Sequence, residues 1–218
     1  MASRPEDSVE LLTAGLEGRP VREQSASDAS GSVISEDRVL VDAARDGDRA
    51  AFGRLYDLYA RMVHGVLLAK VPIIDVDDLV QDVFMLALRR LSTLRESGSF
   101  GAWLAAIARN RANDYHRRSR PEEQLADETS DPEIEGGNTG AGHDDEAALI
   151  LDAVRSLPAA YRETLILRLV EGMTGPEIAA RTGMTHGSVR VNLNRGMRQL
   201  RARLRSNQDG DGPRQEKQ

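Results

Sequence analysis

The residues best suited to chemistry on a nucleic acid lie on one side of a predicted helix that begins at His186. Apolar residues recur in this stretch at spacings of three and four, which places them on the opposite arc. Arginine can pair with guanine, asparagine with adenine, and valine can contact a thymine methyl group, while further arginines meet phosphate. The polar arc and the turn before it therefore predict a DNA-reading face, formed by Thr185, Ser188, Arg190, Val191, Asn194, Arg195 and Arg198.

A second group of cationic and amide side chains follows Phe100, on a helix whose apolar side includes Trp103 and Ile107. Arginine neutralises phosphate, asparagine reads base edges, and an aromatic ring can stack on an unpaired base. We expect Trp103 to belong to the hydrophobic core. The polar side of this helix predicts contacts with a nucleic acid strand.

Carboxylates gather on the helix predicted to begin at Asp75, and Asp78 and Asp82 lie one turn apart. Together with Asp75 and Asp77 they could share a magnesium ion, as in a nuclease, although no lysine, histidine or second acidic cluster completes such a site. For an arbitrary helix, such a face would be solvated and would compensate the helix dipole. The chain has no cysteine and four scattered histidines, which excludes a thiol nucleophile, a disulfide scaffold and a zinc site with sulfur ligands. We expect no catalytic residue, no metal and no cofactor.

The elements that must position these groups are predicted to be helices. Asp48 can cap a first helix that Pro72 ends, a second restarts at Asp75, and the turn Arg95–Ser99 leads to the third near Phe100. No alternating β-branched run interrupts them.

The C-terminal part predicts a helix-turn-helix. Leu157 and Pro158 open one helix, Thr174 caps a short helix with Pro176 in its first turn, and Gly183 ends it before the long basic helix. A short helix, a glycine-containing turn and a long basic helix form this motif in order.

The distribution of charge along the 218 residues is more informative than the net charge of −6. Residues 39–120 carry 13 positive and 10 negative charges, and residues 147–207 carry 10 and 4. Between them, residues 121–146 carry 10 negative charges and no positive charge, which is typical of a flexible, self-repelling linker. We predict an all-α protein of two small helical domains joined by this linker. The expected divisions are a disordered extension (1–35), a first domain (36–120), the linker (121–146), a helix-turn-helix domain (147–206) and a disordered tail (207–218).

Four ordered motifs resemble the extracytoplasmic-function (ECF) group of the bacterial sigma-70 family of RNA polymerase sigma factors. They are AARDGDRAAF (43–52), DVDDLVQDVFMLAL (75–88), FGAWLAAIARNRANDYHRR (100–118) and the stretch from LPAAYRETL to MRQLRARL (157–204). The resemblance covers nearly all of residues 39–206, in the family's order and spacing. It implies a subunit that binds core polymerase, reads the −35 and −10 promoter elements with its two domains, and melts the DNA.

The resemblance also implies a role for each face. The residues Asp78, Leu79, Gln81 and Asp82 are similar to the surface that docks on the polymerase clamp helices. The turn 95–99 resembles a loop that captures a base flipped out of the −10 element, and the helix after it resembles the one that separates the strands. The implied −10 residues are Arg95, Glu96, Ser97, Ser99, Arg109, Asn110, Asn113, Asp114 and Arg117, and the face after Thr185 would read the −35 element.

Partners follow from the same resemblance: core RNA polymerase (clamp helices and flap region), promoter DNA and an anti-sigma factor. The linker would thread toward the RNA exit path. The resemblance also implies a monomer when the protein is free. We expect the protein to be cytoplasmic, because no apolar run is long enough to span a bilayer and no signal peptide is evident. Val191 stands where relatives have a small hydroxyl residue and Asn192 where they have a basic one, so the family does not imply the promoter sequence.

Two further readings compete with this one. A stand-alone helix-turn-helix regulator would bind duplex DNA tightly without polymerase, as a dimer on half-sites about one helical turn apart. A helical scaffold that binds only protein would leave the arginine and asparagine face unexplained.

Overall fold

The structure is a computed structural model, and it describes residues 37–119 and 144–210. All regular elements within these ranges are helical, which confirms the predicted all-α class. The predicted extension (1–35), the linker up to residue 143 and the tail from residue 211 lie outside the described residues. After an N-terminal helix over residues 37–45 come α3 (Arg49–Leu68), α4 (Val76–Arg90), α5 (Phe100–Ser119), α6 (Asp144–Arg155), α7 (Ala159–Leu169), α8 (Gly175–Thr182) and α9 (His186–Gly210).

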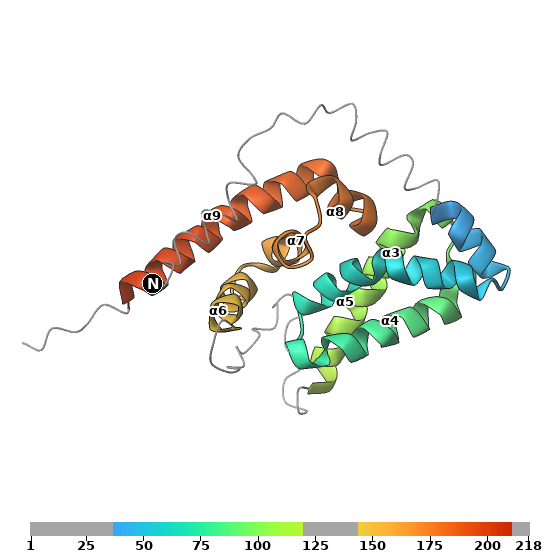
Figure 1. Ribbon diagram of the computed structural model, residues 1–218, viewed down its shortest axis with the longest axis horizontal. Coiled ribbons are helices and arrows are strands. Elements are labelled where there is room, and N and C mark those ends of the chain that lie inside the picture. Colours follow the sequence, from blue (N-terminus) through green and yellow to red (C-terminus); the bar gives the residue numbers. More distant parts are fainter. Residues whose placement is uncertain (1–36, 120–143, 211–218) are drawn as a thin grey trace, which may run out of the picture.

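Helices α3, α4 and α5 form the first helical domain (Figure 1). The Asp48 side chain caps α3 by accepting hydrogen bonds from the backbone N–H groups of Ala50 and Ala51, at 2.8 and 3.1 Å. The apolar stripe of α4 is buried at Val80 and Val83, and α5 contributes further apolar residues to the same cluster. Burial of these stripes is what holds three amphipathic helices together, because each would otherwise expose its apolar side to water.

Helices α6 to α9 form the second helical domain. The Thr174 hydroxyl accepts from the Glu177 N–H, and the Glu177 carboxylate accepts from the Thr174 N–H at 2.7 Å, a capping box that starts α8. The hydrogen bonds that the Thr174 N–H and hydroxyl donate to the Glu177 carboxylate lower the pKa of Glu177. Gly183 ends α8 in the left-handed conformation, and α9 follows and projects beyond the other helices at its far end (Figure 1). The predicted helix-turn-helix is present with its expected caps.

Two helices extend into segments that we predicted to be non-helical. Helix α6 begins at Asp144, inside the segment assigned to the linker, and α9 continues to Gly210, inside the segment assigned to the tail. The N-terminal helix was not predicted either.

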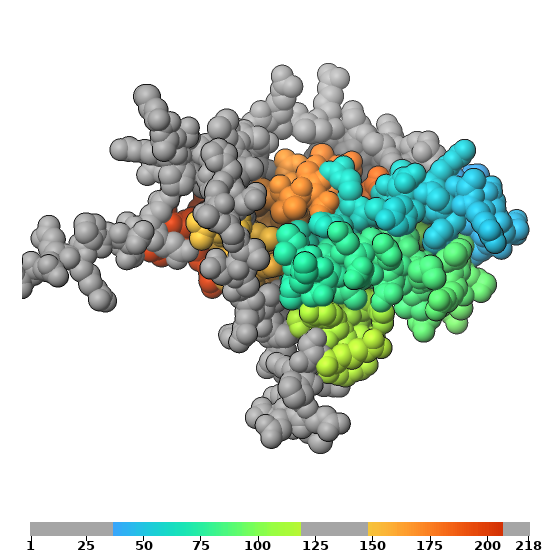
Figure 2. Space-filling view, turned by 60° about the horizontal axis from the view of Figure 1, so that its bottom comes forward, coloured from blue at the N-terminus to red at the C-terminus, as the bar shows by residue number. Residues whose placement is uncertain are grey.

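The two helical domains pack directly against each other, with α7 lying on α3 and α8 lying on α5 and α3. Figure 2 shows the orange surface of the second domain against the blue-green surface of the first. One buried apolar cluster runs through both, from Val66 and Leu67 to Leu165 and Ile166. The sequence predicted a flexible connection and no such contact. Helical periodicity reports which side of a helix is buried, but it does not report which neighbour buries it.

Buried arginines of the second domain join it to the end of α3. Arg155 donates to the carbonyl oxygens of Leu68 and Val71, at 3.2 and 2.9 Å, and Arg162 donates to that of Ala69 at 3.4 Å. The last carbonyl groups of a helix lack intrahelical partners and carry the negative end of its dipole. The second domain therefore supplies the cationic cap of α3.

Two glycines permit the close approach of α8 to α5. A Cβ at Gly101 would lie 2.4 Å from the Arg181 carbonyl oxygen, and a Cβ at Gly183 would lie 2.5 Å from the Ala102 Cβ. Gly183 also has φ +74°, which side chains rarely adopt. Both positions need glycine for the domains to meet.

Candidate functional site

The outward side of α9 displays most of the predicted −35 residues. Ser188, Arg190, Val191, Asn194, Arg195 and Arg198 are all exposed, while Val189, Met197 and Leu200 on the other side are buried. Thr185 caps the helix, because its hydroxyl accepts the Ser188 N–H at 3.1 Å. Among the described residues, no carboxylate lies in salt-bridge range of the arginines on this face. This α9 reading face can therefore meet DNA without first breaking an ion pair with another described residue.

The turn over residues 95–99, which we call the capture turn, joins the end of α4 to α5. Arg95 and Glu96 are exposed, and Ser97 and Ser99 are half-buried in a short 3₁₀ turn. The Ser97 hydroxyl donates to the Asp42 carboxylate, and the Ser99 hydroxyl donates to Glu96 at 3.4 Å. The side chains of Glu96, Ser97 and Ser99 place several oxygen atoms within a span of four residues, and such atoms can form hydrogen bonds.

On α5, the predicted −10 residues do not share one environment. Asn110, Asn113 and Arg117 are exposed, and Arg117 donates to Asp114 at 2.9 Å. Arg109, by contrast, reaches across to the second domain.

Arg109 forms a two-pronged ion pair with Glu163 of α7. Its Nε and Nη2 atoms donate to the two carboxylate oxygens at 3.0 and 2.7 Å. The Glu163 side chain is 9% exposed and that of Arg109 is 30% exposed. The hydrogen bonds that Arg109 donates to Glu163 raise the pKa of Arg109. A fork of two parallel bonds to a carboxylate is among the strongest polar contacts that arginine makes.

A second polar contact joins His64 of α3 to Glu171, between α7 and α8. The Nδ1 atom of His64 lies 2.6 Å from the carboxylate, and Glu171 is buried. The hydrogen bond with Glu171 raises the pKa of His64 and outweighs the opposing effect of burial. The imidazole is therefore held toward its charged form, which pairs with the carboxylate.

The predicted docking surface on α4 is mostly exposed. Asp78, Gln81 and Asp82 lie at the surface, and Leu79 is half-buried against the hydrophobic core. Along the same side, exposed Met85 and Leu88 continue the line toward the end of the helix. We call these five exposed residues the α4 stripe: an acidic half followed by an apolar half. Within the part of the chain that the structure describes, Asp82 of this stripe forms an ion pair with Arg111 of α5.

The same acids do not form a metal centre in this structure. Asp75 accepts a hydrogen bond from the Tyr115 hydroxyl at 2.8 Å, and Asp82 is paired with Arg111. Across residues 37–119 and 144–210, no three side chains of the metal-binding types converge. The nuclease reading therefore gains no support. Within the same ranges, no helix combines the length and apolar character needed to cross a membrane.

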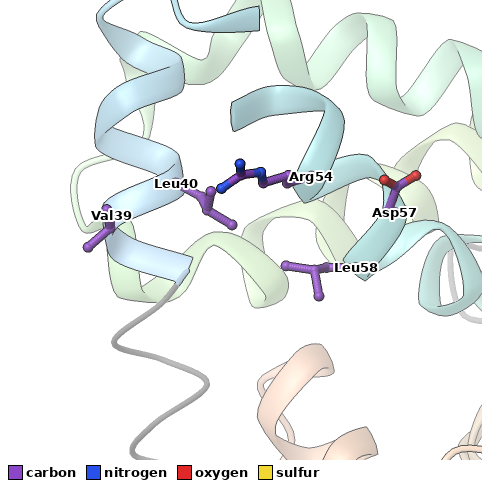
Figure 3. Close-up of a pocket in the computed structure, with 5 residues that line it drawn as sticks. All are labelled: Val39, Leu40, Arg54, Asp57 and Leu58. Carbon is purple, nitrogen blue, oxygen red and sulfur yellow. The ribbon is translucent and has the colours of Figure 1, made fainter. Parts of the chain in front are cut away.

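A groove of about 520 Å³ lies between the N-terminal helix and α3 (Figure 3). Val39 and Leu40 line it from one helix, and Arg54, Asp57 and Leu58 line it from the other. None of these residues was predicted to be functional, and the groove contains no group suited to covalent chemistry. It is a surface feature separate from the three faces described above.

Sequence reasoning identified faces that the structure shows to be exposed, but it missed the residues between the domains. His64, Glu163 and Glu171 had no distinguishing pattern, apart from the fact that two of the four acids in the basic C-terminal domain are these glutamates. Asp42 and Arg45, which hold the capture turn, were missed because their helix was not predicted.

Comparison with known proteins agrees with the division into two domains. The family model of sigma-70 region 2 matches residues 55–122, and that of sigma-70 region 4 matches residues 147–200. The first match contains the α4 stripe and the capture turn, and the second contains the helix-turn-helix.

Similar whole proteins are also found. The chain is 34% identical over 173 residues to the ECF RNA polymerase sigma factor BldN of Streptomyces coelicolor, covering 76% of this chain and 64% of that protein, so it spans less than two thirds of BldN. It is 34% identical over 184 residues to the RNA polymerase sigma factor CnrH of Cupriavidus metallidurans, covering 77% of this chain and 94% of CnrH. The structure of CnrH in complex with the cytosolic domain of CnrY matches with a TM-score of 0.55 at 26% identity, over 81% of this chain and 99% of that one.

Proposed function

Because the chain belongs to the extracytoplasmic-function group of the sigma-70 family and is an RNA polymerase sigma factor, we propose that its two domains divide promoter recognition between the faces described above. The second domain reads the −35 element through the α9 reading face. The first domain docks on core polymerase through the α4 stripe and handles the −10 element through α5 and the capture turn. The observation that carries the assignment is the exposure, on a helix-turn-helix, of an arginine and asparagine face that forms no ion pair with any described residue.

The α4 stripe suits a protein partner better than DNA. Its acidic half would repel phosphate, whereas a cationic protein surface would be attracted to it. Its apolar half, Met85 and Leu88, gives such a partner a surface that can be buried on contact. The clamp helices of core polymerase are the partner we propose here, and the flap region is the one we propose for the second domain.

At the −10 element, the capture turn and α5 would act on separated strands. Opening DNA costs about 1.4 kcal/mol per base-pair step, so contacts to an extruded base and to the strand backbone must offset this cost. The exposed amides of Asn110 and Asn113 and the guanidinium of Arg117 are placed to bind the single strand.

Binding of Arg109 to DNA requires a change between the domains. In the docked arrangement the Nε and Nη2 donors of Arg109 are occupied by Glu163. A phosphate can bind these two donors in place of Glu163 only if α7 withdraws from α5. We therefore propose that reading the −10 element with Arg109 accompanies separation of the two domains, whereas the α9 reading face is available in both arrangements.

The remaining properties follow from the same assignment. CnrH was solved in complex with the cytosolic domain of CnrY, which supports a regulatory protein partner, an anti-sigma factor, for this chain as well. We propose that the protein performs no covalent chemistry of its own, acts in the cytoplasm and is a monomer when free. The family match favours this assignment over the stand-alone regulator.

The first test is binding to core RNA polymerase. We expect Asp78→Arg to abolish stoichiometric co-elution of the full chain with core polymerase, because it reverses the charge at an exposed position of the α4 stripe. Asp57→Arg makes the same change at an exposed position on α3 and should co-elute normally. Loss in both variants, or in neither, would contradict the docking surface. If the unchanged chain does not bind polymerase but binds duplex DNA tightly, the stand-alone regulator is correct.

The second test separates promoter reading from docking. Arg195→Ala should lower −35-dependent transcription by about 5- to 150-fold, the range for losing one specific base contact. Co-elution with polymerase should not change, because Arg195 lies on α9, far along the chain from the α4 stripe. Equal loss of transcription and polymerase binding would refute the assignment of the α9 reading face.

A further inference from the structure

The capture turn is held from outside by the N-terminal helix. The Ser97 hydroxyl donates to Oδ1 of Asp42 and accepts from Nη1 of Arg45 at 3.2 Å. Arg45 also bonds to Asp42 at 3.3 Å and, through Nε, to the Leu91 carbonyl oxygen at 3.4 Å. One arginine thus joins the end of α4, the capture turn and the N-terminal helix.

A third residue of this helix lies over the middle of the turn. The Arg38 side chain packs so closely on Gly98 that a Cβ there would be 2.7 Å from its Nε atom. Arg38 therefore packs on the backbone of the turn, while Asp42 and Arg45 hold its Ser97 hydroxyl. We call these three residues the turn support.

The turn support determines what the Ser97 hydroxyl can offer to a base. A serine hydroxyl has one hydrogen to donate and two lone pairs to accept with. Asp42 takes the hydrogen and Arg45 takes one lone pair. One lone pair remains, so the oxygen facing an incoming base can only accept. Ser99 is biased in the same way, because its hydroxyl donates to Glu96.

We propose that Asp42 and Arg45 are positioning residues that set the base preference of the capture turn by holding the Ser97 hydroxyl as a pure acceptor. This inference rests on the proposed role of the turn in capturing a −10 base. A base that presents an N–H donor to Ser97 is favoured, and a base that presents a ring nitrogen or carbonyl oxygen there meets a second acceptor and is disfavoured. Specificity for DNA thus depends on a helix that does not touch the base.

The experiment compares base preferences rather than overall activity. A promoter for the full chain is first selected from a randomised DNA library with core polymerase and the unchanged protein. Transcription is then measured on templates carrying each of the four bases at every −10 position, for the unchanged protein, Ser97→Ala, Asp42→Ala and Arg45→Lys. Asp46→Ala is the matched control, since Asp46 is exposed just beyond Asp42 with no side-chain contact to the turn among the described residues.

Asp42→Ala frees the hydroxyl hydrogen, so Ser97 can donate as well as accept. We expect the ratio of transcription between the favoured and disfavoured bases at one −10 position to fall by roughly two- to tenfold, the value of one hydrogen bond. The −35 profile and polymerase binding should not change. Arg45→Lys should lower the same ratio at the same position, because lysine keeps the charge but cannot bond to Leu91, Ser97 and Asp42 together. The Asp42 carboxylate that takes the Ser97 hydrogen is then held less firmly. Asp42 is 60% exposed, so its truncation leaves the fold intact.

A uniform loss of transcription on all templates, or an unchanged profile, in Asp42→Ala and Arg45→Lys overturns the positioning role. If Ser97→Ala lowers the ratio between favoured and disfavoured bases but Asp42→Ala and Arg45→Lys do not, the capture turn keeps its proposed function and only this inference fails. If Ser97→Ala also leaves the profile unchanged, the capture role of the turn itself is wrong.

Discussion

The ion pair between Arg109 and Glu163 should control how often the two domains separate. Glu163→Gln removes the negative charge and one of the two hydrogen bonds, while the amide oxygen can still accept from Arg109. The change keeps the size of the side chain, so packing around α7 is preserved.

The expected magnitude follows from the exposure of the two partners. Breaking a fully buried pair costs about 3–5 kcal/mol, and an exposed pair is worth about 0–1 kcal/mol. Here the carboxylate is 9% exposed but the guanidinium is 30% exposed, and one hydrogen bond survives. We expect a loss of about 1–2 kcal/mol of docking free energy, which raises the ratio of separated to docked molecules about 5- to 30-fold.

The chain has no cysteine, which makes the distance between the domains simple to measure. Arg90→Cys and Arg203→Cys introduce two exposed thiols, one at the end of α4 and one near the end of α9. Fluorescent labels on this pair report docked and separated molecules by single-molecule energy transfer. The matched control is Glu96→Gln, an exposed glutamate that bonds only within the capture turn among the described residues. An unchanged distance distribution in Glu163→Gln, or an equal shift in the control, would refute the proposed role of the pair.

The other two predictions concern pH and backbone conformation. Docking raises the pKa of His64 above its ordinary value through the hydrogen bond with Glu171. The stabilisation of the docked arrangement by this bond is therefore complete when the pH is below the ordinary pKa, and it is lost as the pH rises through the raised pKa. The labelled chain should therefore open on going from pH 6 to pH 9, and His64→Gln should remove this dependence; opening on acidification instead would contradict it. Gly183→Ala adds a Cβ beside Ala102 at φ +74° and should lower the free energy of unfolding by about 1–3 kcal/mol, as measured by denaturant titration. Gly187→Ala meets no atom closer than 4.0 Å, and a loss as large in that variant would show that the effect is not due to the contact with Ala102.

The family, the fold class and the exposed faces could be predicted from the sequence. Caps at Asp48, Thr174 and Gly183 act within one turn of chain, so their residue types suffice to locate helix ends. The apolar spacing of α9 likewise determines which side is buried and leaves Asn194 and Arg195 on the other side.

The contacts between distant segments were decided only by the tertiary structure. Whether Arg109 faces solvent or Glu163, 54 positions away, depends on how two helices pack. The apolar spacing within one helix does not identify the helix that packs against it. The same holds for Ser97 and Asp42, and for Arg155 at the end of α3. Local patterns specify helices and their exposed sides, whereas the pairing of charges across domains follows from burial of a shared apolar surface, which no local pattern encodes.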